Sequence, residues 1–150
     1  MLVSVFLFGC SKSDLDIVPD NSTLILGVWE VENSNFNYVI KYLDPIYGTE
    51  VEVQNYSETS TVDGGYIVFR YDSTFSIYQY TNDSLTDSYT LFYEIDENNI
   101  KDDDIILFTI QTLTDNTLSI TNTLLEIWEG DTTYIEERIY TYNCIKSELP

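Results

Sequence analysis

The sequence predicts an all-β protein that folds as an antiparallel up-and-down meander barrel of about eight to nine strands, without a C-terminal helix. Apolar and polar residues alternate with a period of two along most of the chain after residue 23, which is typical of strands with one buried face. Clusters of Asp, Asn, Ser and Gly interrupt this alternation, as turns between strands do. The abundance of tyrosine and phenylalanine also favours strands.

The alternation predicts strands that follow one another with short turns between them. These strands are expected at residues 24–32, 36–43, 50–57, 65–72, 74–81, 88–96, 104–113, 117–128 and 132–142. The segments 72–77 and 115–120 share the pattern D-[SN]-T-[FL]-S-I. Each predicts a tight turn followed by a strand whose two apolar residues point to one face. We assign residues 24–150 to a single domain, because 150 residues suffice for one hydrophobic core.

The charge balance excludes some classes of partner. The chain has 26 acidic and 6 basic residues, which give a net charge of −20. This excess argues against nucleic acid and against anionic headgroups bound through a basic patch. The acidic residues are spread along the chain, so we interpret them as a solvated, self-repelling surface.

The residue types also limit the chemistry. The chain contains no histidine, which excludes Ser–His and Cys–His nucleophilic systems and imidazole metal ligands. Acidic residues are plentiful, but no pair stands out as the two carboxylates of a glycosidase. The densest acidic segment, residues 96–104, has Ile100 where a calcium loop needs an oxygen ligand. We therefore predict a non-catalytic protein without a cofactor or metal, in which 96–104 is a solvated loop; the alternative for this segment is a weak, adventitious calcium site.

The N-terminus has the features of an export signal. Residues 2–8 are apolar apart from Ser4; a helix that spans a bilayer needs roughly 20 residues, so this run fits the core of a secretory signal instead. Leu7-Phe8-Gly9-Cys10 resembles the lipobox of bacterial lipoproteins, in which cleavage precedes a cysteine that is then acylated. The alternative is a frayed apolar terminus with an ordinary buried cysteine.

The lipobox resemblance implies a signal segment at residues 1–9 and lipid attachment at Cys10. The polar and partly acidic residues that follow resemble the tether of lipoproteins from Bacteroidota-type bacteria. That likeness implies a flexible tether over residues 10–23 and an outer-membrane protein on the cell surface, with the periplasmic face as the alternative. The membrane is thus an expected partner, held through more than one acyl chain because a single chain anchors weakly.

A second resemblance concerns the domain itself. Gly27 and Trp29 form a G-x-W signature that looks like the first strand of a lipocalin-like domain. The hairpin at 67–75 and the segments 88–93 and 110–118 look like later strands of that family. A barrel of this size has an interior that side chains fill or that holds one small ligand.

Two functions follow from the barrel. In the first, the interior binds a small apolar or amphipathic ligand. In the second, these side chains are a packed core, and acidic, tyrosine-rich loops bind a partner protein or glycan. The residues expected to line the ligand site are Trp29, Phe69, Phe75, Ile77, Tyr89, Leu91 and Tyr93.

Three turn sequences resemble the D-[ST]-[small or aliphatic] O-glycosylation motif of exported proteins in Bacteroidota-type bacteria. They imply sugars on Ser73, Ser84 and Thr132; the alternative is ordinary turn chemistry. If Cys10 is lipidated, Cys144 has no intrachain partner, and we expect it to be a small buried hydrophobic residue.

Overall fold

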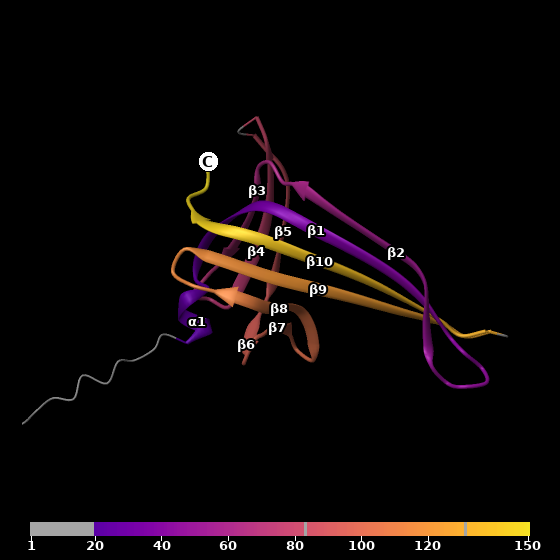
Figure 1. The fold of residues 1–150 in the computed structure, drawn as a ribbon. Helices are drawn as coiled ribbons and strands as arrows, with labels where there is room; N and C mark the ends of the chain where they lie inside the picture. Colours follow the sequence, from indigo (N-terminus) through magenta and orange to yellow (C-terminus); the bar gives the residue numbers. More distant parts are fainter. Residues whose placement is uncertain (1–19, 83, 131) are drawn as a thin grey trace, which may run out of the picture.

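The computed structural model describes residues 20–82, 84–130 and 132–150. It is an all-β protein with 72% strand and 3% helix, which confirms the predicted class. Ten antiparallel strands form one sheet in the order β5-β4-β3-β1-β10-β9-β8-β7-β6, and β2 also pairs with β1 (Figure 1). The closed barrel of eight or nine strands is not confirmed: within the described residues, β5 and β6 are the two ends of an open sheet.

The bounds of the elements show where the turns lie. The elements are α1 (Asn21–Leu24), β1 (Gly27–Leu43), β2 (Glu50–Thr61), β3 (Gly65–Phe69), β4 (Thr74–Thr81), β5 (Ser84–Phe92), β6 (Glu94–Asp96), β7 (Asn99–Asp102), β8 (Ile105–Leu113), β9 (Thr117–Trp128) and β10 (Tyr134–Ser147). No helix in the described part of the chain is long and apolar enough to cross a membrane.

Strand β1 corrects the two shorter strands predicted at 24–32 and 36–43. It runs for 17 residues and absorbs one extra residue in a bulge between Val31 and Asn33. The polar stretch after the bulge stays in the sheet because its amide groups find partners. Asn143 Nδ2 donates to Asn33 Oδ1 at 2.8 Å, and Thr59 Oγ1 donates to Asn35 Oδ1 at 2.7 Å.

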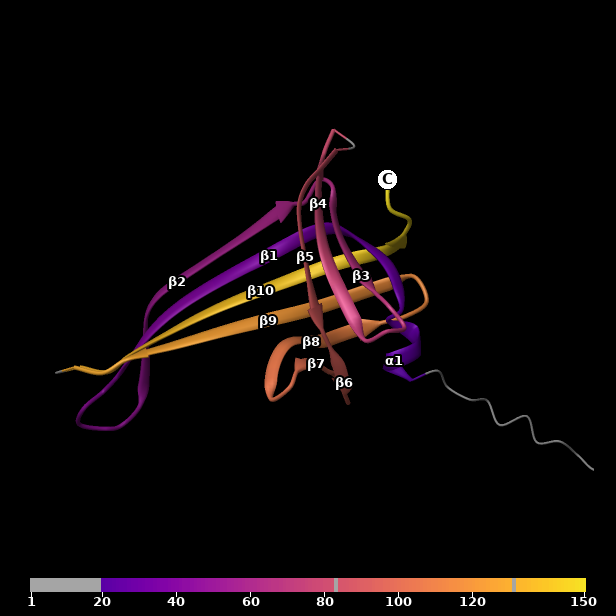
Figure 2. The same ribbon diagram turned by 180° about the vertical axis from the view of Figure 1, so that it is seen from behind.

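The sheet consists of two parts that share β1, β9 and β10. Residues Gly27–Glu30 of β1 pair with β3, whereas Asn33–Leu43 pair with β2. Beyond the bulge, four strands in the order β2-β1-β10-β9 project away from the other strands (Figures 1 and 2). We call this projection the arm, which comprises residues 33–43, 50–61, 122–128 and 134–143, and the remainder the body.

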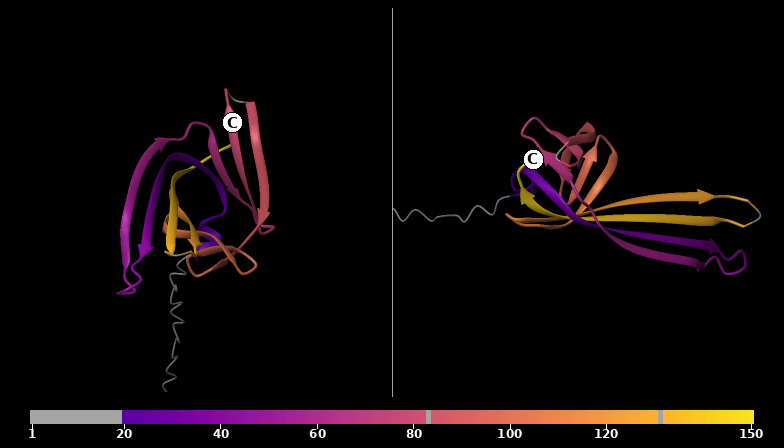
Figure 3. Two further views of the ribbon diagram at one scale, coloured as in Figure 1. Left: turned by 90° about the vertical axis from the view of Figure 1, so that its right-hand side faces the viewer. Right: turned by 90° about the horizontal axis from the view of Figure 1, so that it is seen from above.

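The body encloses the hydrophobic core. Its strands curl until β4 and β5 stand opposite β1 and β10 (Figure 3). Trp29 lies in this core with no exposed surface, and its Nε1 donates to the carbonyl oxygen of Ile25 at 2.6 Å. That carbonyl belongs to the C-cap residue of α1. The strand predicted from residue 24 is therefore wrong at its start, since a helical turn capped by Asp20 precedes β1.

A short hairpin replaces the solvated loop expected at residues 96–104. Strands β6 and β7 pair there, and Ile100 is fully buried in the core. This correction explains the apolar residue in an acidic run, because Ile100 serves packing. The strand predicted at 88–96 is likewise divided: β5 starts earlier, at Ser84, and breaks at Tyr93 before β6.

Candidate functional site

The residues predicted to line a ligand site fall into two groups. Trp29, Phe69, Phe75 and Tyr93 come together in the core of the body. The rings of Phe69 and Phe75 stack with their centroids 5.5 Å apart, and the ring of Tyr93 meets Phe69 edge-on at 5.2 Å. These four side chains therefore fill space against one another.

The other three residues lie on the neighbouring strands β4 and β5. Ile77 is partly buried against the core and pairs with Tyr89, while Phe75 pairs with Leu91. Tyr89 and Leu91 are 49% and 36% exposed. Partial burial and, to a lesser extent, the nearby Tyr142 raise the pKa of Tyr89. The Tyr89 and Leu91 side chains on β5 are therefore open to solvent.

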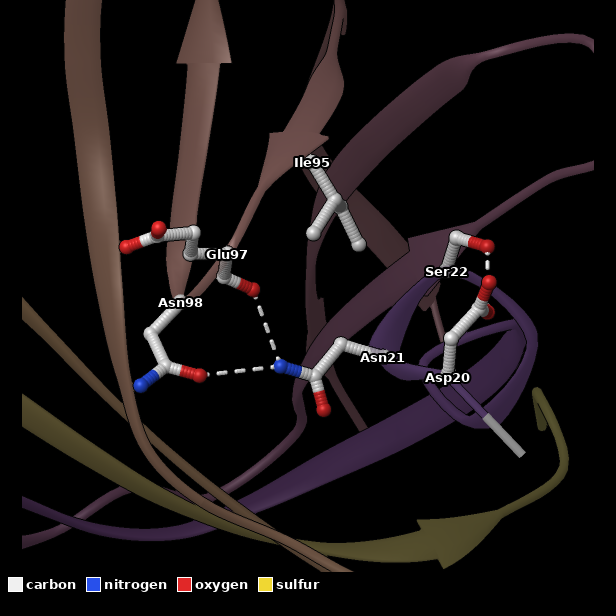
Figure 4. Close-up of a pocket in the computed structure, with 6 residues that line it drawn as sticks. All are labelled: Asp20, Asn21, Ser22, Ile95, Glu97 and Asn98. Atoms are coloured by element: carbon white, nitrogen blue, oxygen red, sulfur yellow. Dashed lines mark hydrogen bonds between the residues drawn. The ribbon is translucent and has the colours of Figure 1, made fainter. Parts of the chain in front are cut away.

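Two surface pockets lie beside α1. The first has a volume of about 500 Å³ and is lined by Asp20, Asn21, Ser22, Ile95, Glu97 and Asn98 (Figure 4). Asn21 Nδ2 donates to the carbonyl oxygen of Glu97 and to Asn98 Oδ1, both at 3.0 Å, and so fastens α1 to the β6–β7 turn. The second pocket, of about 420 Å³, includes Arg70 and Tyr93. Of the four core aromatic residues, only Tyr93 lines either of these pockets.

The remaining predicted sites are distributed over the surface. Cys10 lies outside the described residues, as do Asp83 and Asp131 of two glycosylation motifs. Ser73 is exposed in the β3–β4 turn with φ = 61°. Ser84 is exposed at the start of β5, and Thr132 is half-buried before β10.

Cys144 is a buried free thiol. Burial raises the pKa of the Cys144 thiol to about 12, with a smaller contribution from Glu32. The thiol therefore stays protonated and unreactive at neutral pH. Among the described residues, no group of three or more His, Cys, Asp or Glu side chains is placed to hold a metal ion.

No protein-family model, curated protein or solved structure matches this chain. The arm is the part of the fold that the sequence did not predict.

One face of the arm carries a band of aromatic residues. Cross-strand partners share a face of a sheet, and the register joins Phe36 to Tyr140, Tyr38 to Tyr56, and Tyr134 to both Tyr42 and Trp128. We call these seven residues the aromatic face. It is formed by Phe36, Tyr38, Tyr42, Tyr56, Trp128, Tyr134 and Tyr140.

The aromatic face continues the core of the body. Ring centroids are 6.2 Å apart between Phe108 and Tyr142, which pack at the core. Tyr142 lies two residues after Tyr140 on the same face of β10. The centroid of the Tyr140 ring lies 4.9 Å from that of Phe36. From Phe36 the rings of Tyr38 and Tyr56 follow at 6.3 and 6.4 Å. Aromatic side chains thus follow one face of β10 from the core of the body onto the arm.

An ion pair lies among these rings. Arg138 pairs with the buried carboxylate of Glu136, and its other nitrogen lies 3.7 Å from Glu126. The hydrogen bond and negative charge of Glu136 raise the pKa of Arg138. The aromatic face therefore combines flat apolar rings with one fixed cation and carboxylates.

No second layer of the described chain covers the arm (Figures 1 and 3). Of the 18 exposed large hydrophobic residues in the described part of the chain, ten lie on the strands and tips of the arm. A sheet ordinarily packs at least one face against another layer. An exposed apolar area of this kind marks an interaction surface. The signal in the sequence is the alternation of Tyr and Phe at 36, 38, 42, 134, 140 and 142.

Proposed function

We propose that this protein is a lipid-anchored, non-catalytic lipoprotein of the cell envelope that binds a partner protein through the aromatic face of its arm. The observation that carries the proposal is that the aromatic face exposes Tyr56, Trp128 and Tyr134 and has no covering layer in the described part of the chain. Tyr, Trp and Arg are the residues that contribute most of the energy at protein interfaces. The net charge of −20 favours a basic or neutral partner.

The position of the N-terminal side of the domain supports the anchored arrangement. Helix α1, which overlaps the last residues of the predicted tether, lies at the opposite end of the molecule from the tips of the arm (Figure 1). An acyl anchor at Cys10 would therefore be attached through the tether to the end of the domain that lies opposite the tips of the arm.

A small apolar ligand inside the body has less support. Trp29, Phe69 and Phe75 are closed to solvent, so a ligand between them would have to displace packed rings. Mass spectrometry of compounds retained through native purification tests this alternative. A stoichiometric apolar compound would favour it over a function of the arm.

The arm is tested with a matched pair of double variants. In Tyr56→Ser with Trp128→Ser, two half-exposed rings leave the aromatic face. In the control, Tyr71→Ser with Phe92→Ser, two still more exposed rings leave the body. Immobilised proteins are exposed to an envelope extract of the native host, and a protein retained by the wild type is purified for calorimetry.

We expect the arm variant to bind the purified partner at least tenfold more weakly, because each lost anchor residue costs about 2 kcal/mol. The control variant should match the wild type. Equal affinity in all three proteins contradicts the proposal. If the immobilised wild type no longer retains the partner after the extract is treated with glycosidases, the arm binds a glycan instead.

A further inference from the structure

The outer edge of β9 is open along the arm. Pairing between β8 and β9 ends at Thr109 and Thr121. At this point Asn122 Nδ2 donates to the carbonyl oxygen of Leu107 at 2.7 Å. From residue 122 to residue 128, β9 pairs only with β10 among the described strands. A strand edge of this kind presents backbone N–H and C=O groups to any extended chain.

The two edges of the arm differ in protection. The edge of β2 carries Glu50, Glu52 and Glu58 and a register shift opposite Ile40, which are devices that discourage further pairing. The β9 edge has the sequence Thr-Leu-Leu-Glu-Ile-Trp at 123–128, with Glu126 as its one charged residue. Its pairing with β10 is unbroken from 117 to 128. Only the β9 edge is long, regular and mostly apolar.

We propose that the β9 edge receives an extended segment of the partner protein as an additional strand of the arm. This inference rests on the proposed function and specifies how the partner binds. Backbone hydrogen bonds supply affinity in such strand addition, and alternate side chains supply specificity. A second copy of this chain is a poor occupant, because each copy carries a net charge of −20.

The side chains along the edge specify the segment. Leu124, Glu126 and Trp128 lie on the same side as the aromatic face, since their β10 partners include Arg138 and Tyr134. Leu125 and Ile127 point to the opposite side and are 59% and 54% exposed. The complementary strand therefore has apolar residues throughout and one Lys or Arg opposite Glu126, where opposite charges stabilise a cross-strand pair.

The probe is the peptide acetyl-Tyr-Val-Lys-Val-Tyr-Thr-amide, which places its lysine opposite Glu126 in an antiparallel pairing with residues 123–128. Binding to the full chain is measured by calorimetry. We expect hydrogen exchange of the backbone amides at 122–128 to slow when the peptide binds. A peptide with glutamate in place of lysine should bind about tenfold more weakly.

N-methylated peptides distinguish strand addition from attachment through side chains. Only alternate amides of an added strand point toward its neighbour. One peptide is methylated at the amides of its first, third and fifth residues, and a second peptide at those of its second, fourth and sixth. One of the two should no longer bind, whereas the other should bind almost as well as the unmethylated peptide. Equal binding of both methylated peptides overturns the inference.

Two protein variants locate the site and separate this inference from the proposed function. Leu125→Lys with Ile127→Lys should weaken both the peptide and the natural partner at least tenfold, whereas Val53→Lys on the β2 edge should not. If the partner's affinity depends on Tyr56 and Trp128 but not on Leu125 and Ile127, the arm binds by its face and strand addition is wrong. If the free protein forms dimers and the two β9 substitutions dissociate them, the edge binds a second copy of the chain. That result would also overturn the inference.

Discussion

Trp29 shows how single residues fix the start of the sheet. The Lys146 ammonium lies 4.0 Å from the centre of the Trp29 ring, where a cation is attracted by the π-electrons. The same Nζ donates to the carbonyl oxygen of Leu26, and desolvation lowers the pKa of Lys146. Gly27 has φ = +120°, and a Cβ there would lie 2.9 Å from Cε of Lys146. The G-x-W pair therefore allows Lys146 to cover the indole.

The two tryptophans should differ in their contribution to stability. Trp29 is fully buried, whereas Trp128 is 48% exposed at the end of the arm. Trp29→Ala should lower the free energy of unfolding by about 3–5 kcal/mol, because transfer energy is lost and a cavity remains. Trp128→Ala should cost well under half as much. Urea unfolding of both variants measures the difference, and a larger loss for Trp128→Ala would contradict the assignment of the core.

At the scale of the element, the β3–β4 turn links two distant parts of the body. Asp72 Oδ1 accepts hydrogen bonds from the backbone N–H of Thr74 at 3.1 Å and from its hydroxyl at 2.6 Å. The carbonyl oxygen of Ser73 accepts from the N–H of Tyr93 at 2.9 Å, where β5 gives way to β6. Disturbing the turn should thus loosen the junction between these edge strands.

The contribution of Asp72 should depend on pH. The hydrogen bond from the Thr74 hydroxyl holds the pKa of Asp72 below its ordinary value of 3.8. Its stabilising effect is therefore complete above 3.8 and is lost as the pH falls through the folded-state pKa. Asp72→Asn should lower the urea midpoint at neutral pH, and this difference should shrink in acid below 3.8. A difference independent of pH would show that the carboxylate charge does not support the turn.

Elements with local signals were predictable from the sequence. Strands β4 and β9 occupy the predicted ranges 74–81 and 117–128, because each follows a turn of the repeated D-[SN]-T form. The continuity of β1 was not predictable, because Asn33 is a typical turn residue. Only the structure shows that its side chain accepts a hydrogen bond from Asn143 across the sheet. The β6–β7 hairpin was missed because Ile100 is its only fully buried residue.

For the molecule as a whole, the sequence predicts an acidic surface but not the shape of the sheet. The alternation of Tyr and Phe reads as core or barrel lining, and the seven residues of the aromatic face follow that pattern. They are instead placed on an uncovered arm because β2 pairs with β1 alone. Which face of a strand is covered depends on strand order, and alternation does not encode strand order.

The predicted anchor is a property of the full chain. Cys10→Ala should shift the protein from the membrane fraction to the soluble fraction in its native host, because no acyl chains would be attached. Cys144→Ala is the matched control, since Cys144 is buried in the body and its loss should leave partitioning unchanged. Unaltered membrane association of the Cys10→Ala protein would refute the lipoprotein prediction.

The central pairing of the sheet has a consequence for how the chain acquires its structure. Strand β1 pairs with β10 along nearly its whole length, and the partners at one end, Val28 and Ser147, are separated by most of the sequence. Contacts between distant residues are slow to form, because a long loop must close before they stabilise anything. A chain that emerges residue by residue can pair β1 with β2 and β3 early, but the central pair of β1 and β10 forms only after the last strand has appeared. The order in which strands appear therefore leaves the central pair of the sheet as the last one to form.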